Sequence, residues 1–328
     1  MHKQIKAVCV AIVLMAQVCG TAAAGLDAKD YPSRPIRLIV PGSPGGGTDV
    51  LGRLLADAVG KQLKQTIVVE NKPGASGMLG ADVVLKAPAD GYTLYMAFSA
   101  TLTSNQWLYK DLSYNPERDF IPVAPFAQVP NVLLVHPSVP AHTVSELVAL
   151  AKKEPGKLNY ASSYPGSMSH LSMEMLKQAT SADMVHVPYN GDAPSLTALV
   201  GGQVQVMITN TVNALPMIEA QRIRPLAVTG AQRAAVLPDV PTIAESGVPG
   251  YATTLWYGLA VARGTPPEIV DRLNKAVRYA QETPELIARL KTMGAETLSM
   301  TQAQFVELVR NDSKKLGAVI ESVGITVN

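Results

Sequence analysis

Residues 36–50 read IRLIVPGSPGGGTDV, an apolar run rich in β-branched residues that stops at a cluster of Pro and Gly. After the glycines, Thr48 and Asp49 open a stretch in which leucines recur at helical spacing. This pattern predicts a buried strand, a glycine loop and a helix N-terminus. Such a loop directs unpaired backbone N–H groups and the positive end of a helix dipole at one point, which suits an anion.

The glycines do not match a nucleotide-binding loop. No lysine follows them, so the Gly-x-x-x-x-Gly-Lys-Ser/Thr phosphate loop is absent, and the third glycine of a dinucleotide fingerprint is missing. A neutral cradle of amides is better matched to a carboxylate. A glycine-rich turn that binds nothing is the alternative at this point. The ligand-binding candidates in this loop are Gly45, Gly46, Gly47, Thr48 and Asp49.

The first 24 residues have the pattern of a secretory signal peptide, with a basic start, an apolar run and three alanines before the expected cleavage point. The apolar run is too short to span a membrane. Cys9 and Cys19 both lie in this segment, so the mature chain is expected to have no disulfide and no cysteine metal site. Lipidation at Cys19 is a weaker alternative, because Gln17 and Val18 precede it where small residues are preferred. We expect a soluble protein of the periplasm.

Charge argues against nucleic acid as a partner. The chain has 28 Lys and Arg residues and 26 Asp and Glu residues, and the leader holds two of the lysines and none of the acids. The mature chain is therefore neutral overall, and it contains no basic block. A mature chain of roughly 300 residues is long enough to build its core without disulfides, usually as two domains.

Strand and helix patterns alternate along the chain. This alternation predicts an α/β architecture with mainly parallel sheets covered on both faces. The tail changes character and reads as three consecutive helices, at 266–281, 284–293 and 301–323. The expected strands are 36–40, 67–70, 93–98, 132–136, 158–161, 184–187, 204–208 and 226–229, and the expected helices between them are 50–63, 79–86, 144–153, 171–178, 195–200 and 214–221.

A second loop repeats the theme of the first. The strand at 158–161 is followed by SSYPGSMS at 162–169 and then by a helical pattern. Ligands of α/β sheets bind at the carboxyl ends of strands, so two such loops on facing domains would hold one small molecule from both sides. Two unrelated loops are the alternative. The candidates here are Ser162, Ser163, Tyr164, Gly166, Ser167, Ser169 and His170.

Enzyme motifs are not met. The segment 74–78 has its second glycine one place too early for a Gly-x-Ser-x-Gly elbow. Ser169 and His170 are neighbours, and adjacent side chains on a helix diverge by about 100°, which is poor geometry for a nucleophile and its base. No histidine pair has the i,i+4 spacing of a metal motif. We expect no catalysis, no metal and no cofactor.

Further motifs, in one order along the whole mature length, resemble those of the Bug receptors, the periplasmic substrate-binding proteins of tripartite tricarboxylate transporters. The glycine loop at 44–49 is one of them. The others are YPSRPIR at 31–37, VENKPGA at 69–75, APADGYTL at 87–94, PGKLNYASS at 155–163, VHVPY at 185–189, GGQV at 201–204, LPDVPT at 237–242 and GTP at 264–266.

The resemblance implies a two-domain clamshell of the periplasmic-binding-protein kind, with one domain at 31–130 plus 252–328 and the other at 131–251. It implies that the two loops bind a ligand carboxylate, partly through water, and that a membrane permease of one large and one small subunit receives the ligand. The receptor is expected to be a monomer. Ser99, Thr101, Thr209 and Asn210, each at the end of an expected strand, complete the candidate site.

Departures from the family pattern concern the ligand. The second loop often reads Ser-Ser-Gly-Asn-Gly, whereas Tyr164 and Pro165 follow the two serines here. Many members have Asp-Asn where this chain has Thr209-Asn210, so an acid that could bind a ligand ammonium is missing. Gly42-Ser43-Pro44 replaces a frequent Phe-Pro-Pro. We therefore expect a mono- or dicarboxylate without an amino group, with an aromatic acid slightly ahead because Tyr164 offers a flat face.

Two other functions stay open from the sequence. A ligand-sensing receptor of the same fold could act on a sensor kinase, and neighbouring permease genes would favour transport instead. A secreted hydrolase with an oxyanion site at Gly45–Gly47 is more distant, because the nucleophile elbow is missing.

Overall fold

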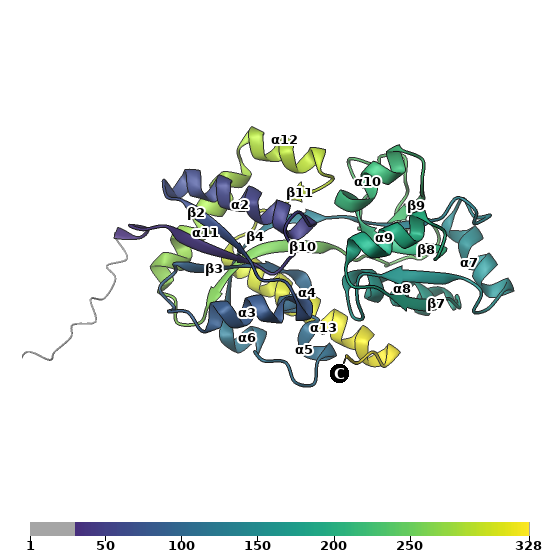
Figure 1. Ribbon diagram of the computed structural model, residues 1–328, viewed down its shortest axis with the longest axis horizontal. Helices are drawn as coiled ribbons and strands as arrows, with labels where there is room; N and C mark the ends of the chain where they lie inside the picture. The colour runs from purple at the N-terminus through teal and green to yellow at the C-terminus, as the bar shows by residue number, and fades with distance from the viewer. Residues whose placement is uncertain (1–29, 328) are drawn as a thin grey trace, which may run out of the picture.

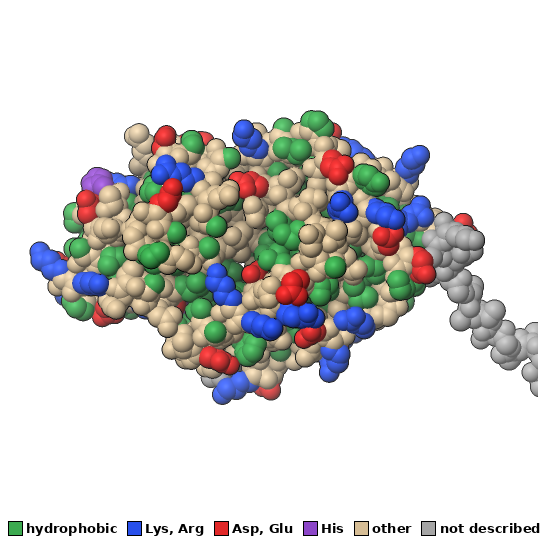
Figure 2. Space-filling view, turned by 180° about the vertical axis from the view of Figure 1, so that it is seen from behind, with side chains coloured by type: hydrophobic (Ala, Val, Ile, Leu, Met, Phe, Trp, Pro, Cys, Tyr) green, Lys and Arg blue, Asp and Glu red, His purple; other side chains and the backbone are tan. Residues whose placement is uncertain are grey.

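The computed structural model describes residues 30–327, so the expected leader lies outside the described residues. The chain forms two α/β halves, each built on one sheet (Figure 1). Among the described residues, no helix is both long and apolar enough to cross a membrane. Lys and Arg side chains are interspersed with Asp and Glu side chains over the face shown in Figure 2.

The first half contains a six-stranded sheet in the order β11-β4-β10-β3-β1-β2. Strand β1 pairs in parallel with β2 and β3, whereas β10 is antiparallel to both β3 and β4. The strands are β1 (Ile36–Val40), β2 (Ile67–Asn71), β3 (Thr93–Phe98), β4 (Phe120–Val129), β10 (Leu255–Ala262) and β11 (Glu296–Thr297).

Helices cover both faces of this sheet because each presents an apolar stripe. On one face α2 (Gly47–Leu63), α11 (Pro267–Gln281) and α12 (Pro284–Thr292) pack in one hydrophobic cluster with the strands. On the other face lie α3 (Met78–Leu85) and α13 (Gln302–Val323). Three short helices, α4 (Ser99–Leu102), α5 (Asn105–Leu108) and α6 (Pro116–Asp119), follow β3.

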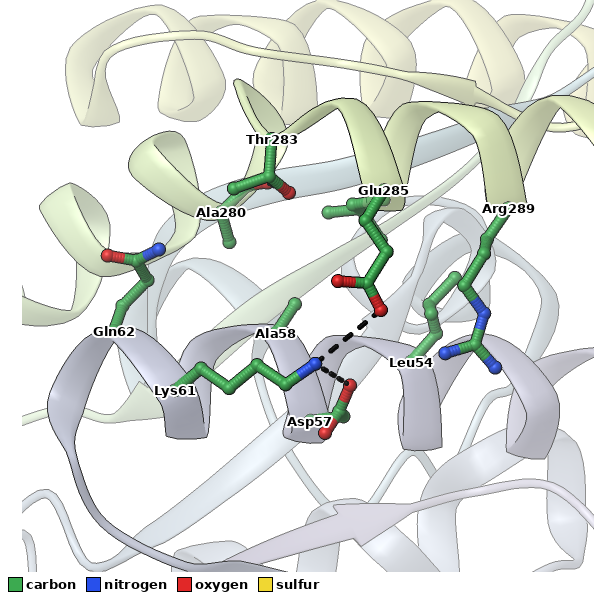
Figure 3. Close-up of a pocket in the computed structure, with 10 residues that line it drawn as sticks. Leu54, Asp57, Ala58, Lys61, Gln62, Ala280, Thr283, Glu285 and Arg289 are labelled. Atoms are coloured by element: carbon green, nitrogen blue, oxygen red, sulfur yellow. Dashed lines mark hydrogen bonds and ion pairs between the residues drawn. The ribbon is translucent and has the colours of Figure 1, made fainter.

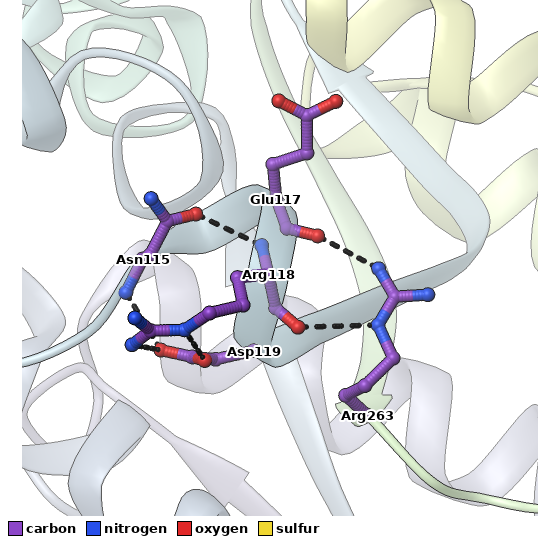
Figure 4. A network of polar contacts seen from close by, with 5 residues as sticks. All are labelled: Asn115, Glu117, Arg118, Asp119 and Arg263. Atoms are coloured by element: carbon purple, nitrogen blue, oxygen red, sulfur yellow. Dashed lines mark hydrogen bonds and ion pairs between the residues drawn. The ribbon is translucent and has the colours of Figure 1, made fainter.

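A polar network fixes α6 beside the end of β10 (Figure 4). Asn115 caps this helix, since its side chain accepts the backbone N–H of Arg118 at 2.8 Å. The guanidinium of Arg263 donates to the carbonyls of Glu117 at 2.7 Å and Arg118 at 3.2 Å. These bonds satisfy carbonyls at a helix end, so we interpret the network as structural.

The second half contains a five-stranded sheet in the order β7-β6-β8-β5-β9, in which only β5 runs against the others. Helices α7 (Val144–Lys153) and α8 (Met168–Thr180) cover one face. Helices α9 (Asp192–Val200) and α10 (Thr211–Glu219) cover the other. The strands are β5 (Asn131–Val135), β6 (Asn159–Ser162), β7 (Val185–Pro188), β8 (Val206–Asn210) and β9 (Arg224–Val228).

The sequence analysis missed strands β4, β10 and β11. Pro122 and Pro125 argue against a strand at β4, because proline cannot donate to a sheet ladder. The structure accommodates them opposite Ala260 and Gly258 of β10, where the register of the pair shifts. Because of β10 and β5, both sheets are mixed, although four strands in each share one direction.

The chain crosses between the halves twice, at Pro130 between β4 and β5, and again between β9 and β10. Backbone bonds join the two crossings: Thr229 donates to Asn131 at 2.8 Å, and Thr253 donates to Thr229 at 2.9 Å. Helix α13 also bridges the halves, since Leu316 packs in one hydrophobic cluster with residues of α5 and α8. The carboxyl end of β8 pairs with the start of β5, so it lies at this junction.

Candidate functional site

Helix α4 begins directly after β3 and α10 directly after β8, and short loops lie between β1 and α2, between β6 and α8 and between β7 and α9. Burial raises the pKa of Tyr257 of the first half, Thr48 of α2 opposes this, and the charge of Asp192 of α9 in the second half raises the pKa further. Helix N-termini at strand ends suit an anion, so the starts of these helices are the candidate anion-binding groups.

The start of α2 leaves amides available, as the sequence predicted. Gly46 is an extended N-cap that offers no side-chain acceptor. The first bond of the helix runs from the Val50 N–H to the Gly46 carbonyl at 3.0 Å. Among the described residues, no acceptor bonds the N–H groups of Gly47, Thr48 and Asp49. These three donors are the candidate anion-binding groups of the first half.

Asp49 has a supporting role instead of facing a ligand. Its Oδ2 accepts the Gly45 N–H at 2.9 Å and Arg53 Nε at 3.0 Å, and its Oδ1 accepts Asn71 Nδ2 at 2.9 Å. Burial alone would raise the pKa of Asp49, but these hydrogen bonds lower it. The side chain thus stabilises the conformation of the glycine loop, because both of its oxygens are bonded to protein groups.

The serines of the second loop are brought together, and they bond mainly to one another. Ser169 Oγ accepts the Ser163 N–H at 3.1 Å and lies 2.8 Å from Ser167 Oγ. Ser167 is also the N-cap of α8 and accepts the N–H of His170 at 3.3 Å. Hydroxyls that appeared free for a ligand in the sequence therefore hold the shape of the loop.

Two stacked histidines support this loop from inside the second half. The rings of His170 and His186 lie 3.8 Å apart at 10°, and Tyr160 stacks on His186 at 4.9 Å. The Gly166 N–H donates to His170 Nδ1 at 2.9 Å, and Ser162 Oγ lies 2.6 Å from His186 Nε2. Burial, aided by the charge of His186, lowers the pKa of His170 to about 4, so the ring is neutral at pH 7.

Tyr164 lies between the two halves. Its side chain is partly buried, and burial raises the pKa of its phenol, followed by the charge of Asp192. Tyr109 and Tyr257 of the first half also raise the pKa of this phenol.

Asp192 is the main residue that the sequence analysis missed. Its Oδ1 accepts the Ser163 hydroxyl, and its Oδ2 lies 3.4 Å from Asn210 Nδ2. Asp192 thus places a carboxylate next to Asn210, the residue that follows Thr209. The sequence feature that could have indicated Asp192 is its position, since it follows Gly191 at the start of a helix after a strand end.

Several buried polar atoms near the strand ends have no hydrogen-bond partner among the described residues: Ser99 Oγ, Asn105 Oδ1, Asn131 Nδ2 and Thr209 Oγ1. Of these, Asn105 and Asn131 were not expected. The expected hydroxyl of Thr101 is not free, because it donates to the Phe98 carbonyl at 2.8 Å. Unpaired buried polar groups are costly in a folded chain, and a bound ligand or water would compensate them.

A groove between α2 and α12 lies at the opposite end of α2 (Figure 3). Lys61 pairs there with Asp57 at 3.0 Å and with Glu285 at 3.6 Å. These side chains are exposed, and ion pairs of this kind contribute little to stability. We assign no ligand to this groove. Among the described residues, no group of three His, Cys, Asp or Glu side chains could hold a metal ion.

Two α/β halves joined by two crossings, with strand ends meeting at the junction, form the two-domain clamshell of the periplasmic binding proteins. The chain belongs to the tripartite tricarboxylate transporter receptor family, whose model matches residues 51–325. The resemblance to the Bug receptors is thereby confirmed. BugT of Bordetella pertussis is 33% identical over 303 residues, which cover 92% of this chain and 93% of BugT.

Solved structures agree with this assignment. R. palustris Rpa4515, solved with adipate, is 39% identical with a TM-score of 0.85, and the match covers 90% of this chain and 99% of that one. MatC from Rhodopseudomonas palustris, solved with malate, is 34% identical with a TM-score of 0.79 over 88% of this chain and 100% of MatC. The family is one of solute-binding receptors, and both of these relatives hold carboxylates.

Proposed function

We propose that this protein is a periplasmic receptor that binds a small carboxylate between its two halves and delivers it to a membrane transporter of the tripartite tricarboxylate type. The observation that carries the proposal is the uncapped start of α2, where the N–H groups of Gly47, Thr48 and Asp49 have no acceptor among the described residues. Carboxylates bound by two relatives support this ligand class. The comparisons lend no support to a sensor or a hydrolase.

Other parts of the proposal follow from family membership. The permease would comprise one large and one small subunit, the receptor would act as a monomer without catalysis, and the leader would direct export. We also propose domains at 31–130 plus 252–328 and at 131–251. The strands of the six-stranded sheet fall in the first set of residues and those of the five-stranded sheet in the second, which supports this division.

We also propose a mono- or dicarboxylate without an amino group, in line with the adipate and malate held by two relatives. Because Asp192 places an acid next to Asn210, amino dicarboxylates are the comparison that tests this preference. Tyr164 still offers a ring at the junction, so aromatic acids belong in any ligand screen. Binding should be measured by calorimetry with aliphatic, aromatic and amino dicarboxylates and with citrate.

Substituting Gly46→Val should weaken carboxylate binding by about 10- to 100-fold, because each hydrogen bond to an ionised group is worth about 1.5–3 kcal/mol. The φ of Gly46 is −76°, which valine adopts, and a Cβ there would lie 3.2 Å from the Ser43 carbonyl oxygen. Gly201→Val is a matched control, since its Cβ would lie 3.3 Å from the Thr197 carbonyl oxygen at the other end of α9. Equal affinities in both variants and the native protein would exclude the α2 loop from the site.

A further inference from the structure

Helix α10 of the second half contacts the first half directly beyond the end of β8. The hydroxyl of Thr211, the first residue of α10, donates to the carbonyl of Gly294, which follows α12, at 2.7 Å. The next residue, Val212, packs against the hydrophobic cluster of the first half. Thr211 is fully buried, and Figure 1 shows α12 and α10 on the same side of the molecule. This contact joins the two halves in addition to the two crossings of the chain.

The backbone beyond α12 allows this close approach. Gly294 follows Met293, the C-cap of α12, and has φ +73°, a left-handed conformation that glycine adopts without strain. A Cβ at this position would lie 2.9 Å from Thr211 Oγ1 and 2.9 Å from Leu215 Cδ1. Glycine therefore leaves room for α10. Among the described residues, Thr211 is the donor that the Gly294 carbonyl accepts.

The same threonine is tied to a crossing and to the candidate site. Its N–H donates at 3.0 Å to the carbonyl of Pro130, where the chain passes from β4 to β5. It directly follows Asn210, the N-cap of α10, whose backbone pairs with Asn131. Asn131 Nδ2 and Thr209 Oγ1, at the same strand end, are buried without a partner among the described residues. A shift of Thr211 relative to Gly294 would therefore move this end of the candidate site relative to the first half.

Separating α10 from α12 would cost more than one hydrogen bond. The Gly294 carbonyl would lose its donor, and an unpaired buried carbonyl is costly until water reaches it. Two halves joined by short crossings can rotate as rigid bodies. A contact between the halves selects among their orientations, because it forms in some of them and is broken in others. The bond between Thr211 and Gly294 thus favours the arrangement of the halves described above.

We propose that Thr211 is a positioning residue of the receptor: its bond to Gly294 holds the two halves in this arrangement and thereby sets the affinity for the carboxylate. The effect on affinity rests on the proposed carboxylate-binding function, whereas the effect on the arrangement of the halves does not. A threonine that only stabilised the fold would lower the free energy of unfolding and leave both properties unchanged.

Distances between the halves test the proposal without a ligand. The mature chain is expected to have no cysteine, so Lys86→Cys and Lys152→Cys, exposed and in different halves, give a unique pair of spin-label sites. Thr211→Val keeps the size of the side chain and removes the hydroxyl, and pulsed electron paramagnetic resonance should show a shifted or broadened distance distribution. Thr265→Val is the matched control, because Thr265 is 4% exposed and donates to Ala262, within the first half, at 2.8 Å. Its distribution should match that of the native protein.

Calorimetry with adipate and malate as probes, the acids held by two relatives, measures the consequence for binding. In Thr211→Val the affinity for the better-bound acid should fall by about 5- to 30-fold, which corresponds to the loss of one hydrogen bond. Thr265→Val should bind as the native protein does, although it loses a similar bond. Thr211→Ser keeps the hydroxyl, so it should retain the native affinity and the native distances.

The outcomes separate this proposal from the proposed function. An unchanged distance distribution or an unchanged affinity in Thr211→Val, or equal losses of affinity in Thr211→Val and Thr265→Val, would overturn the role of Thr211 and leave the receptor function intact. If the native protein binds no carboxylate of the screen, the proposed function fails, and the distances still decide whether Thr211 holds the halves. If Thr211→Val does not fold, Thr211→Ala, which also removes the hydroxyl, takes its place in both measurements.

Discussion

Lowering the pH from 7 to 4 should destabilise the protein by about 3 kcal/mol through the single side chain of His170. The folded-state pKa of this histidine is lowered from 6.5 to about 4, mainly by burial and then by the charge of His186. The unfolded chain therefore takes up the proton first. The free energy of unfolding falls as the pH drops from about 6.5 towards 4 and is unaffected by His170 above that window.

The groups around His170 define what the experiment reports. Glu174 raises the pKa of His170, and Lys177 lowers it. The ring of His186 stacks on His170, and the ring of Tyr160 lies tilted at 6.2 Å from it. His170 Nδ1 accepts the Gly166 N–H. If Nδ1 were protonated, its own N–H would point at the Gly166 N–H, and the hydrogen bond would be lost. Acid should therefore loosen the second loop as well as destabilise the fold.

Urea unfolding at pH 7 and pH 4 would measure the effect in the native protein and in His170→Gln. The variant keeps an acceptor but has no titrating ring, so it should lose about 3 kcal/mol less between the two pH values. His142→Gln, at an exposed position, should follow the native protein. An equal loss in the native protein and in His170→Gln would show that His170 does not titrate as described.

The strand–loop–helix units could be predicted because each is local in sequence. Periodicity and turn residues at 36–58 and 158–178 predicted β1, α2, β6 and α8, and the structure confirms all four. The sequence also indicated that loops at strand ends would form the candidate site. These predictions needed only short-range patterns, which a single sequence contains.

Other features depend on contacts between distant segments. Strand β4 forms despite Pro122 and Pro125 because the register of its pairing with β10 shifts at both prolines, which accommodates their missing N–H groups. No local sequence pattern encodes that pairing. The contacts of Asp192 with Ser163 and Asn210 form only when three segments that are distant in sequence meet. The bonds of the loop serines to one another depend on the folded path of the loop, which the sequence pattern does not show.

Substituting Gly166, which packs against α5, should markedly lower the free energy of unfolding. Gly166 has φ +76°, and a Cβ there would lie 2.4 Å from Leu108 Cδ1. Leu108 is 2% exposed and packs with Met168, so it has little room to move. In Gly166→Ala we expect about 1–2 kcal/mol of backbone strain and a further 1–3 kcal/mol from overpacking.

Two variants separate strain from overpacking. Gly156 has φ +72° and nothing within 4 Å of its Cβ position, so Gly156→Ala should cost the strain alone. In a Leu108→Ala background, Gly166→Ala should likewise cost only strain, because the leucine is gone. The coupling energy of the double-mutant cycle, measured by denaturant unfolding, should be about 1–3 kcal/mol.

Calorimetry should show weaker carboxylate binding in Gly166→Ala, because the displaced loop carries Ser163, which bonds Asp192. If Gly166→Ala costs no more than Gly156→Ala and binding is unchanged, the loop is not held against α5 in solution, and the second half of the site must be positioned by α8 and α13 alone.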